Sequence, residues 1–506
     1  MEQMSLLEGV GPIEGLGPTT VEEPKQHTQI STELNAKVLL GPAGTGKSTM
    51  IREMREKFNL ALTATTGIAA YNLGQGASTI NSLIGYYNID SLRRNMEESS
   101  WHNRLWRKLK GIDGIVIDEV SMLSCDLLDE LTRIFVSMNE WRGNNGKPPF
   151  KVLLTGDFLQ LPPVMKGLPI EATPPYAFFA GFWPKYYGPN TIQLKHIYRQ
   201  TDPRFLQALQ YAREGRGADC AALFRAAGVK FAAQPWYNYP GMSLYPTNQS
   251  VELHNRTRLA EIDAPGFSLQ AERWGEQTDV LREIPDAVGF KETCRARVTI
   301  NSPDGMLTYV NGQLGEVVGL AKDPYGTEMT PVVLFDGYAQ PMVIERTWRF
   351  AYRPLQPGDE PLIAQTNNWL RDVAATLPTY GNDSASDWNE RELTEAQKKA
   401  VFPEVIKNIL SPQHILPFYD PREKMVAIGA ARYVPLVLGY ASTFHKSQGL
   451  TFDRVQIDVR NRFAGQPQMV YVALSRCRTL EGLTIVGTPD QLARRILTSP
   501  AVREFI

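Results

Sequence analysis

The sequence is poor in the features that mark secreted, membrane-spanning and zinc-binding proteins. Its 506 residues include four cysteines, which lie far apart and form no C-x-x-C pair: Cys125, Cys220, Cys294 and Cys477. This spacing argues against a disulfide framework or a cysteine zinc site and fits a reducing compartment. No apolar run approaches the length of a membrane span, and the N-terminus has no signal-peptide pattern. We therefore expect a cytosolic protein with no membrane partner.

An excess of charge of one sign is also missing. The 53 Lys and Arg residues nearly balance the 54 Asp and Glu residues, so any contact with nucleic acid has to come from local basic patches. With 43% hydrophobic and 21% charged residues, the composition is that of an ordinary soluble globular protein. The length exceeds what one core usually serves, which predicts two or more domains.

One short stretch predicts a nucleotide site. Residues 41–49 read GPAGTGKST, which fits the phosphate-loop pattern G-x-x-x-x-G-K-[ST]. An apolar run precedes it and helical spacing follows it, so we expect a strand, a glycine loop and a helix whose N–H groups cradle polyphosphate. Lys47 would reach the β- and γ-phosphates and Ser48 would bind Mg²⁺. The predicted nucleotide contacts are Gly41, Ala43, Gly44, Thr45, Gly46, Lys47, Ser48 and Thr49.

Two further strands end in residues suited to phosphate chemistry. The apolar run at 114–118 ends in Asp118 and Glu119, which predicts Asp118 in the Mg²⁺ shell and Glu119 as the general base for an attacking water. The run at 151–155 leads into a loop with two prolines that cannot continue a strand or helix. Because α/β sheets bind ligands at the carboxyl ends of their strands, Gln160 in that loop could sense the γ-phosphate.

The segment 86–110 interrupts the α/β alternation. It places six basic residues among Tyr86, Tyr87, Trp101 and Trp106. Two interpretations remain open: a contact with single-stranded nucleic acid, with the rings stacked on bases, or a solvated amphipathic helix, which the acidic pair at 97–98 favours.

Strand–turn–helix alternation resumes at 443–451 and 472–476, which predicts a second α/β domain. An arginine of that domain could enter the nucleotide site across a cleft. Between 262 and 432 the pattern favours an insertion with short antiparallel strands, a hairpin turn at Asn311-Gly312 and a polar helical stretch at 360–410. Residues 1–35 read as a flexible leader in which Gln26 or Gln29 could contact an adenine edge.

In the order of these motifs, the sequence resembles the PIF/RecD-like group of superfamily 1 DNA helicases, and it is similar to the Dda-type phage helicases. Six segments carry the resemblance: GPAGTGKST, TATTGIAA, IVIDEVSML, LLTGDFLQLPPV, ASTFHKSQGLTFD and YVALSRCRTLEGL. The implied fold is α/β, with two RecA-like P-loop domains (1A and 2A), a 1B pin and a 2B insertion containing an SH3-like β-barrel. The expected boundaries are 36–85 and 111–188 for 1A, 86–110 for 1B, 189–261 and 433–506 for 2A, and 262–432 for 2B.

The resemblance also implies roles for individual residues. Gln160 becomes the nucleotide sensor, and Arg199 and Arg476 become the two arginines on the γ-phosphate. Gln26, Gln448 and Gly449 complete the expected nucleotide contacts. Expected DNA contacts are Thr65, Thr79, Asn248, Thr443, His445 and Lys446, together with Trp101 and Trp106 in the pin.

The activity implied is an ATP- and Mg²⁺-dependent helicase that moves 5′-to-3′ on single-stranded DNA and unwinds forked or tailed duplex. We expect a monomer, in the nucleoid of a bacterial or phage-infected cell, that meets single-stranded-DNA-binding or replication proteins in replication, repair or recombination. Two alternatives remain: a RecD-like motor subunit of a larger repair or recombination complex, and a P-loop ATPase switch that unwinds nothing.

Overall fold

The structure, a computed structural model, describes residues 34–506 except 43, 75, 87, 98, 164–171, 198–201, 303–307, 324–327, 378–392 and 410–415. It divides into two compact units. The first comprises Met1–Arg258, Asn301–Gly312 and Tyr440–Ile506, and the second comprises Leu259–Ile300 and Gln313–Gly439. The predicted leader lies almost wholly outside the described residues.

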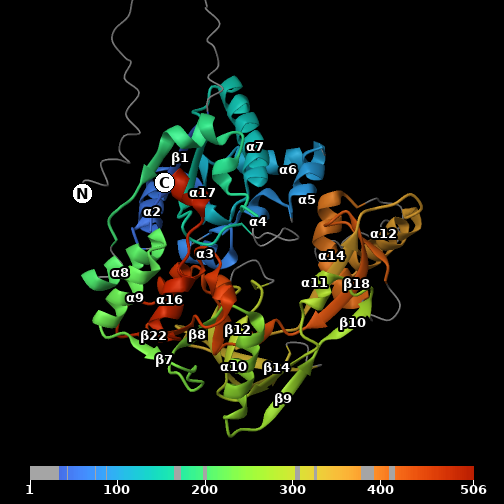
Figure 1. The fold of residues 1–506 in the computed structure, drawn as a ribbon. Helices are drawn as coiled ribbons and strands as arrows, with labels where there is room; N and C mark the ends of the chain where they lie inside the picture. The colour runs from blue at the N-terminus through green and yellow to red at the C-terminus, as the bar shows by residue number, and fades with distance from the viewer. Residues whose placement is uncertain are drawn as a thin grey trace, which may run out of the picture. The chain divides into compact units, whose positions relative to one another are not determined.

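The N-terminal part of the first unit is a six-stranded parallel sheet (Figure 1). Its strand order is β3-β2-β4-β5-β1-β6, and every pair is parallel. The strands are β1 (Asn35–Leu40), β2 (Leu60–Ala64), β3 (Ser78–Thr79), β4 (Gly114–Asp118), β5 (Lys151–Gly156) and β6 (Thr191–Gln193). Their near-continuous apolar runs are typical of parallel strands that are covered on both faces.

Helices connect these strands. They are α2 (Lys47–Lys57), α3 (Gly67–Leu73), α4 (Ile80–Ile84), α5 (Ile89–Met96), α6 (Ser99–Leu109) and α7 (Cys125–Asn144). Ile51 of α2 and Leu73 of α3 share one core with Leu39, Leu62 and Val116 of the sheet. This core places the start of α2 at the carboxyl end of β1, where the glycine loop turns.

The expected end of the first α/β domain at residue 188 differs from the structure. Strand β6 pairs in parallel with β1, with Val38 opposite Thr191, and the amide of Leu194 donates to Leu40 O at 2.7 Å. Residues 191–193 therefore form the edge of the first sheet, although the sequence-based boundary assigned them to the second domain.

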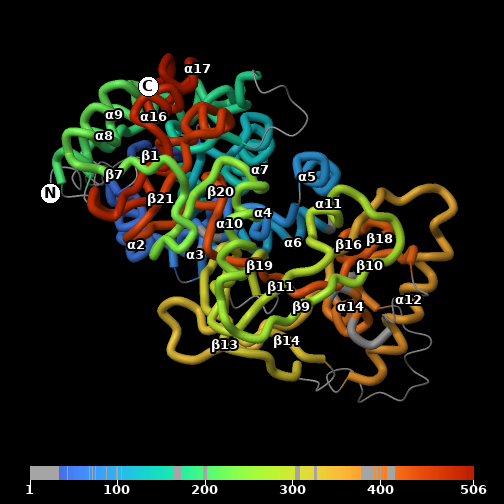
Figure 2. Tube along the Cα trace, turned by 60° about the horizontal axis from the view of Figure 1, so that its bottom comes forward, coloured from blue at the N-terminus to red at the C-terminus, as the bar shows by residue number. Residues whose placement is uncertain are grey.

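The second α/β part has five parallel strands in the order β20-β8-β21-β22-β7. They are β7 (Lys230–Ala232), β8 (Met242–Tyr245), β20 (Ala441–Thr443), β21 (Val455–Asp458) and β22 (Leu483–Val486). Its helices are α8 (Pro203–Glu214), α9 (Gly217–Ala226), α10 (Asn248–Ala260), α15 (Met469–Leu474), α16 (Pro489–Arg495) and α17 (Pro500–Phe505). Helix α16 packs on α9, so residues 489–495 lie beside residues 217–226 (Figure 2). The expected second parallel α/β sheet is confirmed.

The second unit is built from antiparallel strands, as the alternating pattern predicted. A five-stranded sheet has the order β15-β14-β13-β12-β19, with β12 (Arg295–Val298), β13 (Leu314–Lys322), β14 (Met329–Phe335), β15 (Met342–Val343) and β19 (Leu436–Leu438). A four-stranded sheet holds β10 (Glu272–Gly275), β16 (Thr347–Arg353), β17 (Phe418–Asp420) and β18 (Met425–Tyr433). Strands β9 (Gly266–Gln270) and β11 (Ala287–Lys291) pair with each other, and α11 is Asp279–Arg282.

The hairpin expected at Asn311-Gly312 takes a different form. Strands β12 and β13 are antiparallel neighbours, with Arg297 opposite Leu314. The connection between them spans residues 299–313, however, and part of it belongs to the first unit. The dipeptide is thus a turn at the end of a long connection, not a two-residue hairpin loop.

The stretch 360–410, which reads as polar in the sequence, has a core of its own. Helices α12 (Glu360–Ala374) and α14 (Glu395–Ile409) pack together. Leu370, Val401 and Phe402 are buried with Phe418 and Ala427 of β17 and β18. This helical pair covers one face of the four-stranded sheet.

Candidate functional site

The glycine loop has the geometry that its sequence predicts. Gly44 and Gly46 have φ angles of 85° and 82°, a region that side chains other than glycine seldom adopt. Lys47 opens α2, and its Nζ donates to Gly41 O at 2.7 Å and to Pro42 O at 2.9 Å. Thr45 Oγ1 donates to Pro42 O at 3.1 Å. The loop is therefore closed by its own side chains.

The Lys47 ammonium is partly buried between acidic groups. Burial lowers the pKa of Lys47, while the nearby carboxylates of Asp157, Asp118 and Glu119 oppose that shift. An anionic ligand beside Lys47 would favour its charged form, because an opposite charge at short range stabilises an ammonium group.

Asp118 ends β4 next to β5. Its Oδ1 accepts a hydrogen bond from Oγ1 of Thr155, a polar residue in an otherwise apolar strand. Burial raises the pKa of Asp118, and the Thr155 hydrogen bond and the Lys47 charge work against that rise. The sequence analysis did not identify Thr155 as a site residue. Its position between Leu154 and Gly156, as a polar residue at the end of an apolar strand, would have indicated it.

Glu119 follows Asp118 in a strained backbone conformation. Its φ is 58°, in the left-handed region that costs a residue with a Cβ atom about 1–2 kcal/mol. Thr65 Oγ1 holds this turn by donating to Glu119 O at 3.0 Å. Burial raises the pKa of the Glu119 carboxyl and so does Asp118, against the opposing effects of Lys47, Arg476 and Gln448.

Residues of the second parallel sheet reach this carboxylate. Gln448 Nε2 donates to Glu119 Oε2 at 3.2 Å. Arg476 is 2% exposed, donates to Val472 O at 2.9 Å and Leu450 O at 3.2 Å, and lies near enough to Glu119 to affect its pKa. Gly449 accepts a 2.9 Å hydrogen bond from Asn72 Nδ2 of α3. Gln448, Gly449 and Arg476 are therefore brought to the first sheet as expected.

Gln160 lies in a tight turn at the carboxyl end of β5. Its amide donates to Asp157 O at 2.8 Å, and the amide of Leu159 donates to Asp157 Oδ1 at 3.1 Å. The Gln160 side chain is 3% exposed, and its Oε1 has no hydrogen-bond partner among the described residues. The same holds for Oε1 of Gln448 within the described part of the chain. Two buried amide oxygens thus remain available to a bound water or hydroxyl group.

Some predicted residues lie outside the described residues: Ala43, Arg199 and Gln26. The remaining residues predicted for the glycine loop occupy the turn and the first residues of α2: Gly41, Gly44, Thr45, Gly46, Ser48 and Thr49.

The residues expected to hold DNA follow neighbouring strands in each sheet. Thr65 comes directly after β2 and Thr79 ends β3, and these strands pair in parallel. Thr443 ends β20 while Asn248 follows β8, its parallel neighbour. The carboxyl ends of parallel strands share one edge, so each pair lies on the ligand-binding edge of its sheet. His445 and Lys446 are exposed in the 3-10 turn after Thr443.

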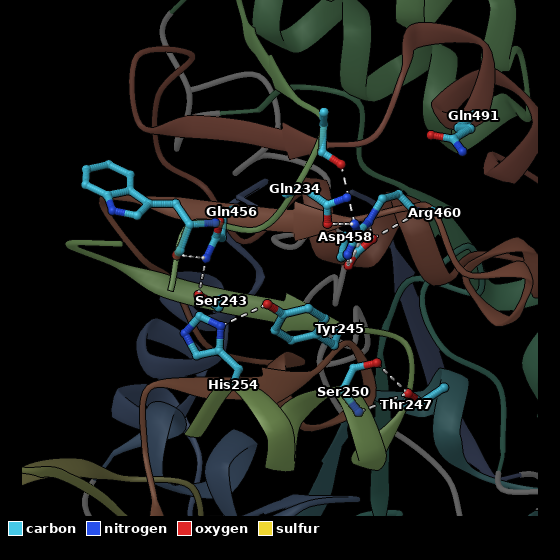
Figure 3. A network of polar contacts seen from close by, with 12 residues as sticks. Gln234, Ser243, Tyr245, Thr247, Ser250, His254, Gln456, Asp458, Arg460 and Gln491 are labelled. Carbon is cyan, nitrogen blue, oxygen red and sulfur yellow. Dashed lines mark hydrogen bonds and ion pairs between the residues drawn. The ribbon is translucent and has the colours of Figure 1, made fainter. Parts of the chain in front are cut away.

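A polar network that the sequence did not reveal lies in the second sheet (Figure 3). Tyr245 OH pairs with His254 Nδ1 at 2.9 Å, and Thr247 Oγ1 pairs with Ser250 Oγ at 3.0 Å at the start of α10. Burial lowers the pKa of His254 to about 4, so its imidazole is neutral at physiological pH. The network fixes the turn that carries Asn248.

Trp101 is not available for the expected role in base stacking. It is 4% exposed in α6, so its ring is part of the core. Trp106, one and a half turns further along α6, is partly buried and lies edge-on to His102 at 5.8 Å between ring centroids. Arg93 of α5 pairs with Glu130 of α7 at 2.8 Å. The described residues of segment 86–110 therefore form two helices, of which α5 is anchored on α7 and α6 packs on α5, and one of the two tryptophans is buried.

The described residues include no helix with the length and apolar character that a membrane crossing requires. Within the same residues, no three His, Cys, Asp or Glu side chains gather as a metal-binding group.

Comparison with known proteins extends the resemblance over most of the chain. A family model described as "AAA domain" matches residues 24–233. The chain is 28% identical to the ATP-dependent DNA helicase PIF1 of Emericella nidulans and 29% identical to the ATP-dependent DNA helicase RRM3 of Saccharomyces cerevisiae, in each case over 92% of this chain. It spans 60% and 64% of the lengths of these two proteins. It is 26% identical to the ATP-dependent DNA helicase Pif1 of Bdellovibrio bacteriovorus, over 98% of this chain and 94% of that protein.

Solved structures agree on the fold. The crystal structure of Pif1 helicase from Candida albicans matches with a TM-score of 0.63 at 23% identity, covering 94% of this chain and 95% of that one. Pif1 helicase from Bacteroides in complex with ADP-AlF3 and ssDNA matches with the same TM-score and identity, covering 94% and 93%. The predicted recognition is confirmed: over most of its length, the chain is related to the Pif1- and RRM3-type superfamily 1 DNA helicases.

Proposed function

We propose that the chain is an ATP-dependent DNA helicase and translocase that moves 5′-to-3′ along single-stranded DNA and separates duplex ahead of it. The observation that carries this proposal is the contact of Glu119 with the second parallel sheet. A carboxylate suited to activate water lies at the end of β4, and Gln448 of the second sheet donates to it. ATP hydrolysis with Glu119 as the general base would therefore change a contact between the two sheets.

The residues at the site fit ATP as substrate and Mg²⁺ as its ion. The glycine loop and the N-terminus of α2 offer N–H groups to the phosphates, and Lys47 offers an ammonium group. The Ser48 hydroxyl and the Asp118 carboxylate would hold Mg²⁺, since this ion prefers oxygen ligands. When bound, Mg²⁺ would neutralise charge on the phosphate oxygens.

The hydrolytic step follows from the positions of the protein groups. Glu119 would take a proton from a water whose oxygen bonds to the γ-phosphorus, while the bond from that phosphorus to the β–γ bridging oxygen breaks. Gln160 would orient the attacking water, which would donate a hydrogen bond to its free Oε1, and its amide nitrogen would donate to the γ-phosphate. Arg476, together with Arg199 by resemblance, would balance charge on the transferred phosphoryl group.

Movement along DNA would come from the two ligand-binding edges. Thr65 and Thr79 on one sheet, and Asn248 and Thr443 on the other, present groups suited to phosphate oxygens. Contacts of this kind fix position without reading sequence. The Bacteroides Pif1 structure, which contains ssDNA and ADP-AlF3, supports the same ligands for this chain.

We extend the proposal to the parts of the fold. The two parallel sheets would be domains 1A and 2A, and helices α5 and α6 would form the 1B pin, with Trp106 as its aromatic residue. The five-stranded antiparallel sheet of the second unit would belong to an SH3-like barrel within 2B. We also propose that the protein is a monomer and that its substrate is a forked or tailed duplex. It would interact with single-stranded-DNA-binding or replication proteins. The location of the protein and its closeness to Dda-type helicases stay predictions.

The two alternatives are less well supported. A nucleotide switch has no need of a general base that is contacted from the second sheet, as Glu119 is. A RecD-like subunit would show its activity only within a larger complex, so experiments on the isolated chain separate it from an autonomous helicase.

The test is ATP turnover by the purified chain with and without a single-stranded DNA oligonucleotide. We expect DNA to raise kcat at least about tenfold, because closure of the site would require both sheets to be held in position. Turnover that DNA leaves unchanged would contradict the proposal and favour the switch.

A further inference from the structure

A buried cluster of three side chains joins the Gln160 turn to two helices of the second parallel sheet. Asp157 is 1% exposed at the end of β5. Arg213 Nη2, from α8, donates to its Oδ1 at 3.0 Å, and Tyr471 OH, from α15, donates to its Oδ2 at 3.2 Å. Both carboxylate oxygens are thus held by residues that lie far away in the sequence.

The same carboxylate sets the shape of the Gln160 turn. Oδ1 of Asp157 also accepts from the amide of Leu159 at 3.1 Å, and Asp157 O accepts from the amide of Gln160 at 2.8 Å. A shift of the carboxylate therefore moves the backbone that carries Gln160. The hydrogen bonds from Leu159, Tyr471 and Arg213 to this carboxylate are all charge-assisted. Arg213 is the one of these three donors that also carries a charge, so its ion pair at 3.0 Å is the main constraint on the carboxylate.

The cluster has nucleotide-site residues on both sides. On the side of the first sheet, Lys47 lies near enough to Asp157 and Arg213 for their charges to affect its pKa. On the second, Tyr471 precedes Arg476 by little more than one helical turn and feels its charge. Arg213 Nε is buried and has no hydrogen-bond partner among the residues that the structure describes. The Arg213 guanidinium therefore has a donor left for an alternative arrangement.

The residue after Asp157 makes a second connection of the same kind. The Phe158 ring lies edge-on to Phe505 of α17, with 5.4 Å between centroids. Consecutive residues of one turn thus contact three helices of the second α/β part: α8, α15 and α17.

We propose that Asp157, Arg213 and Tyr471 form a clasp that positions Gln160 and transmits the nucleotide state between the two sheets, so that DNA binding accelerates ATP turnover. This inference rests on the proposed helicase function. The three are positioning residues, because they act on the reacting groups through Gln160 and through α15, the helix that precedes Arg476. A packed polar cluster with two arrangements is the kind of element that can couple distant sites.

The chain contains a matched control. In the second unit, Asp420 is fully buried and accepts from Arg422 Nη2 at 2.7 Å and from Tyr352 OH at 2.8 Å. This trio has the same chemistry as the clasp but joins β16 and β17 inside one unit. Variants of this trio report the effect of breaking a buried Asp–Arg–Tyr cluster in the unit that does not contain Gln160.

The experiment compares Arg213→Gln, Asp157→Asn and Tyr471→Phe with Arg422→Gln and Tyr352→Phe in the full chain. Each variant is assayed for thermal midpoint, ATP KM, and kcat with and without a single-stranded oligonucleotide. We expect Arg213→Gln and Asp157→Asn to lower the DNA-stimulated kcat at least about tenfold with ATP KM within about threefold. The ratio of DNA-stimulated to DNA-free turnover should fall with it, and Arg213→Lys should restore part of that ratio.

Two comparisons decide the result. The double variant Asp157→Asn/Arg213→Gln should lose about as much kcat as the worse single variant, because residues that act as a unit are not additive. The control variants should lose thermal stability without losing DNA stimulation. If the clasp variants keep the same stimulation as controls of equal thermal midpoint, the clasp is only structural and the inference is wrong. Tyr471→Phe, which removes one hydroxyl group, decides the matter if the charge variants do not fold. A wild-type chain without DNA stimulation would instead overturn the proposed function itself.

Discussion

Gln448 donates a 3.2 Å hydrogen bond to the carboxylate of Glu119 across 329 positions of sequence. The donor belongs to the turn after β20 and the acceptor follows β4, so this single bond joins the carboxyl edges of the two parallel sheets. The proposed function depends on this hydrogen bond, because it connects the group expected to activate water to the second sheet.

The first prediction concerns the general base. Glu119→Gln keeps the size and the hydrogen-bond acceptor of the side chain but cannot take a proton from water. We expect DNA-stimulated kcat to fall about 10²–10⁴-fold, the usual contribution of a general base. Nucleotide binding, measured by equilibrium titration, should stay near the wild-type value. Turnover within a few-fold of wild type would show that another group activates the water.

The second prediction concerns the donor to that base. Gln448→Met removes the amide while preserving much of its volume. We expect kcat to fall about 10- to 100-fold, because hydrogen bonds to charged groups contribute about 1.5–3 kcal/mol. In the Glu119→Gln background, Gln448→Met should lower kcat by a much smaller factor, because the two residues act together. Equal losses in both backgrounds would mean that Gln448 acts independently of Glu119.

The third prediction follows from the raised carboxyl pKa values. Asp118 and Glu119 bind protons more tightly in the folded chain than in the unfolded chain, because burial disfavours their charges. Their contribution to stability is therefore full below the ordinary values of 3.8 and 4.5 and is lost as the pH rises through the folded pKa. Without nucleotide and in EDTA, Asp118→Asn and Glu119→Gln should have higher thermal midpoints than wild type at neutral pH.

The same measurement repeated at acidic pH supplies the control. The difference in thermal midpoint between each variant and wild type should become smaller as the pH approaches the ordinary carboxyl pKa values. At that pH the wild-type carboxyl groups are protonated as well. Amide variants that are less stable than wild type at neutral pH would contradict the assigned direction of the pKa shifts.

The fourth prediction separates the two tryptophans of α6. Trp101→Ala should lower the free energy of unfolding by about 3–5 kcal/mol, the usual cost of removing a large ring from a core. Trp106→Ala should cost less stability because its ring is only partly buried. If Trp106 serves in the pin, strand separation should fall more than DNA-stimulated ATPase activity. Equal loss of both activities would place Trp106 in the core or in the grip on DNA.

The local parts of this fold and site could be predicted from the sequence. Lys47 belongs to a loop that follows an apolar strand, and Asp118 ends another apolar strand. The sequence therefore predicts both the motif and its position at the carboxyl end of the sheet. The parallel and antiparallel regions differ in their hydrophobic pattern, which is why the second unit was expected to be antiparallel. These features depend on residues close together in the chain.

Features that depend on distant contacts could not be read in the same way. Thr155, Arg213 and Tyr471 acquire their partners only when β4, β5, α8 and α15 come together. An aromatic residue at helical spacing has the same pattern whether its ring stacks on a base or fills a core, so the burial of Trp101 was not foreseeable. The edge strand β6 is three residues long, too short for a periodic signal.

If ATP hydrolysis drives this chain along DNA, the purified chain should separate the strands of a tailed duplex. Two duplexes of identical sequence, one with a 5′ single-stranded tail and one with a 3′ tail, are incubated with the purified chain and ATP in Mg²⁺ buffer. We expect wild type to separate the 5′-tailed duplex in preference to the 3′-tailed one and Glu119→Gln to separate neither. Separation of neither duplex by wild type, or a preference for the 3′ tail, would contradict ATP-driven 5′-to-3′ movement along DNA.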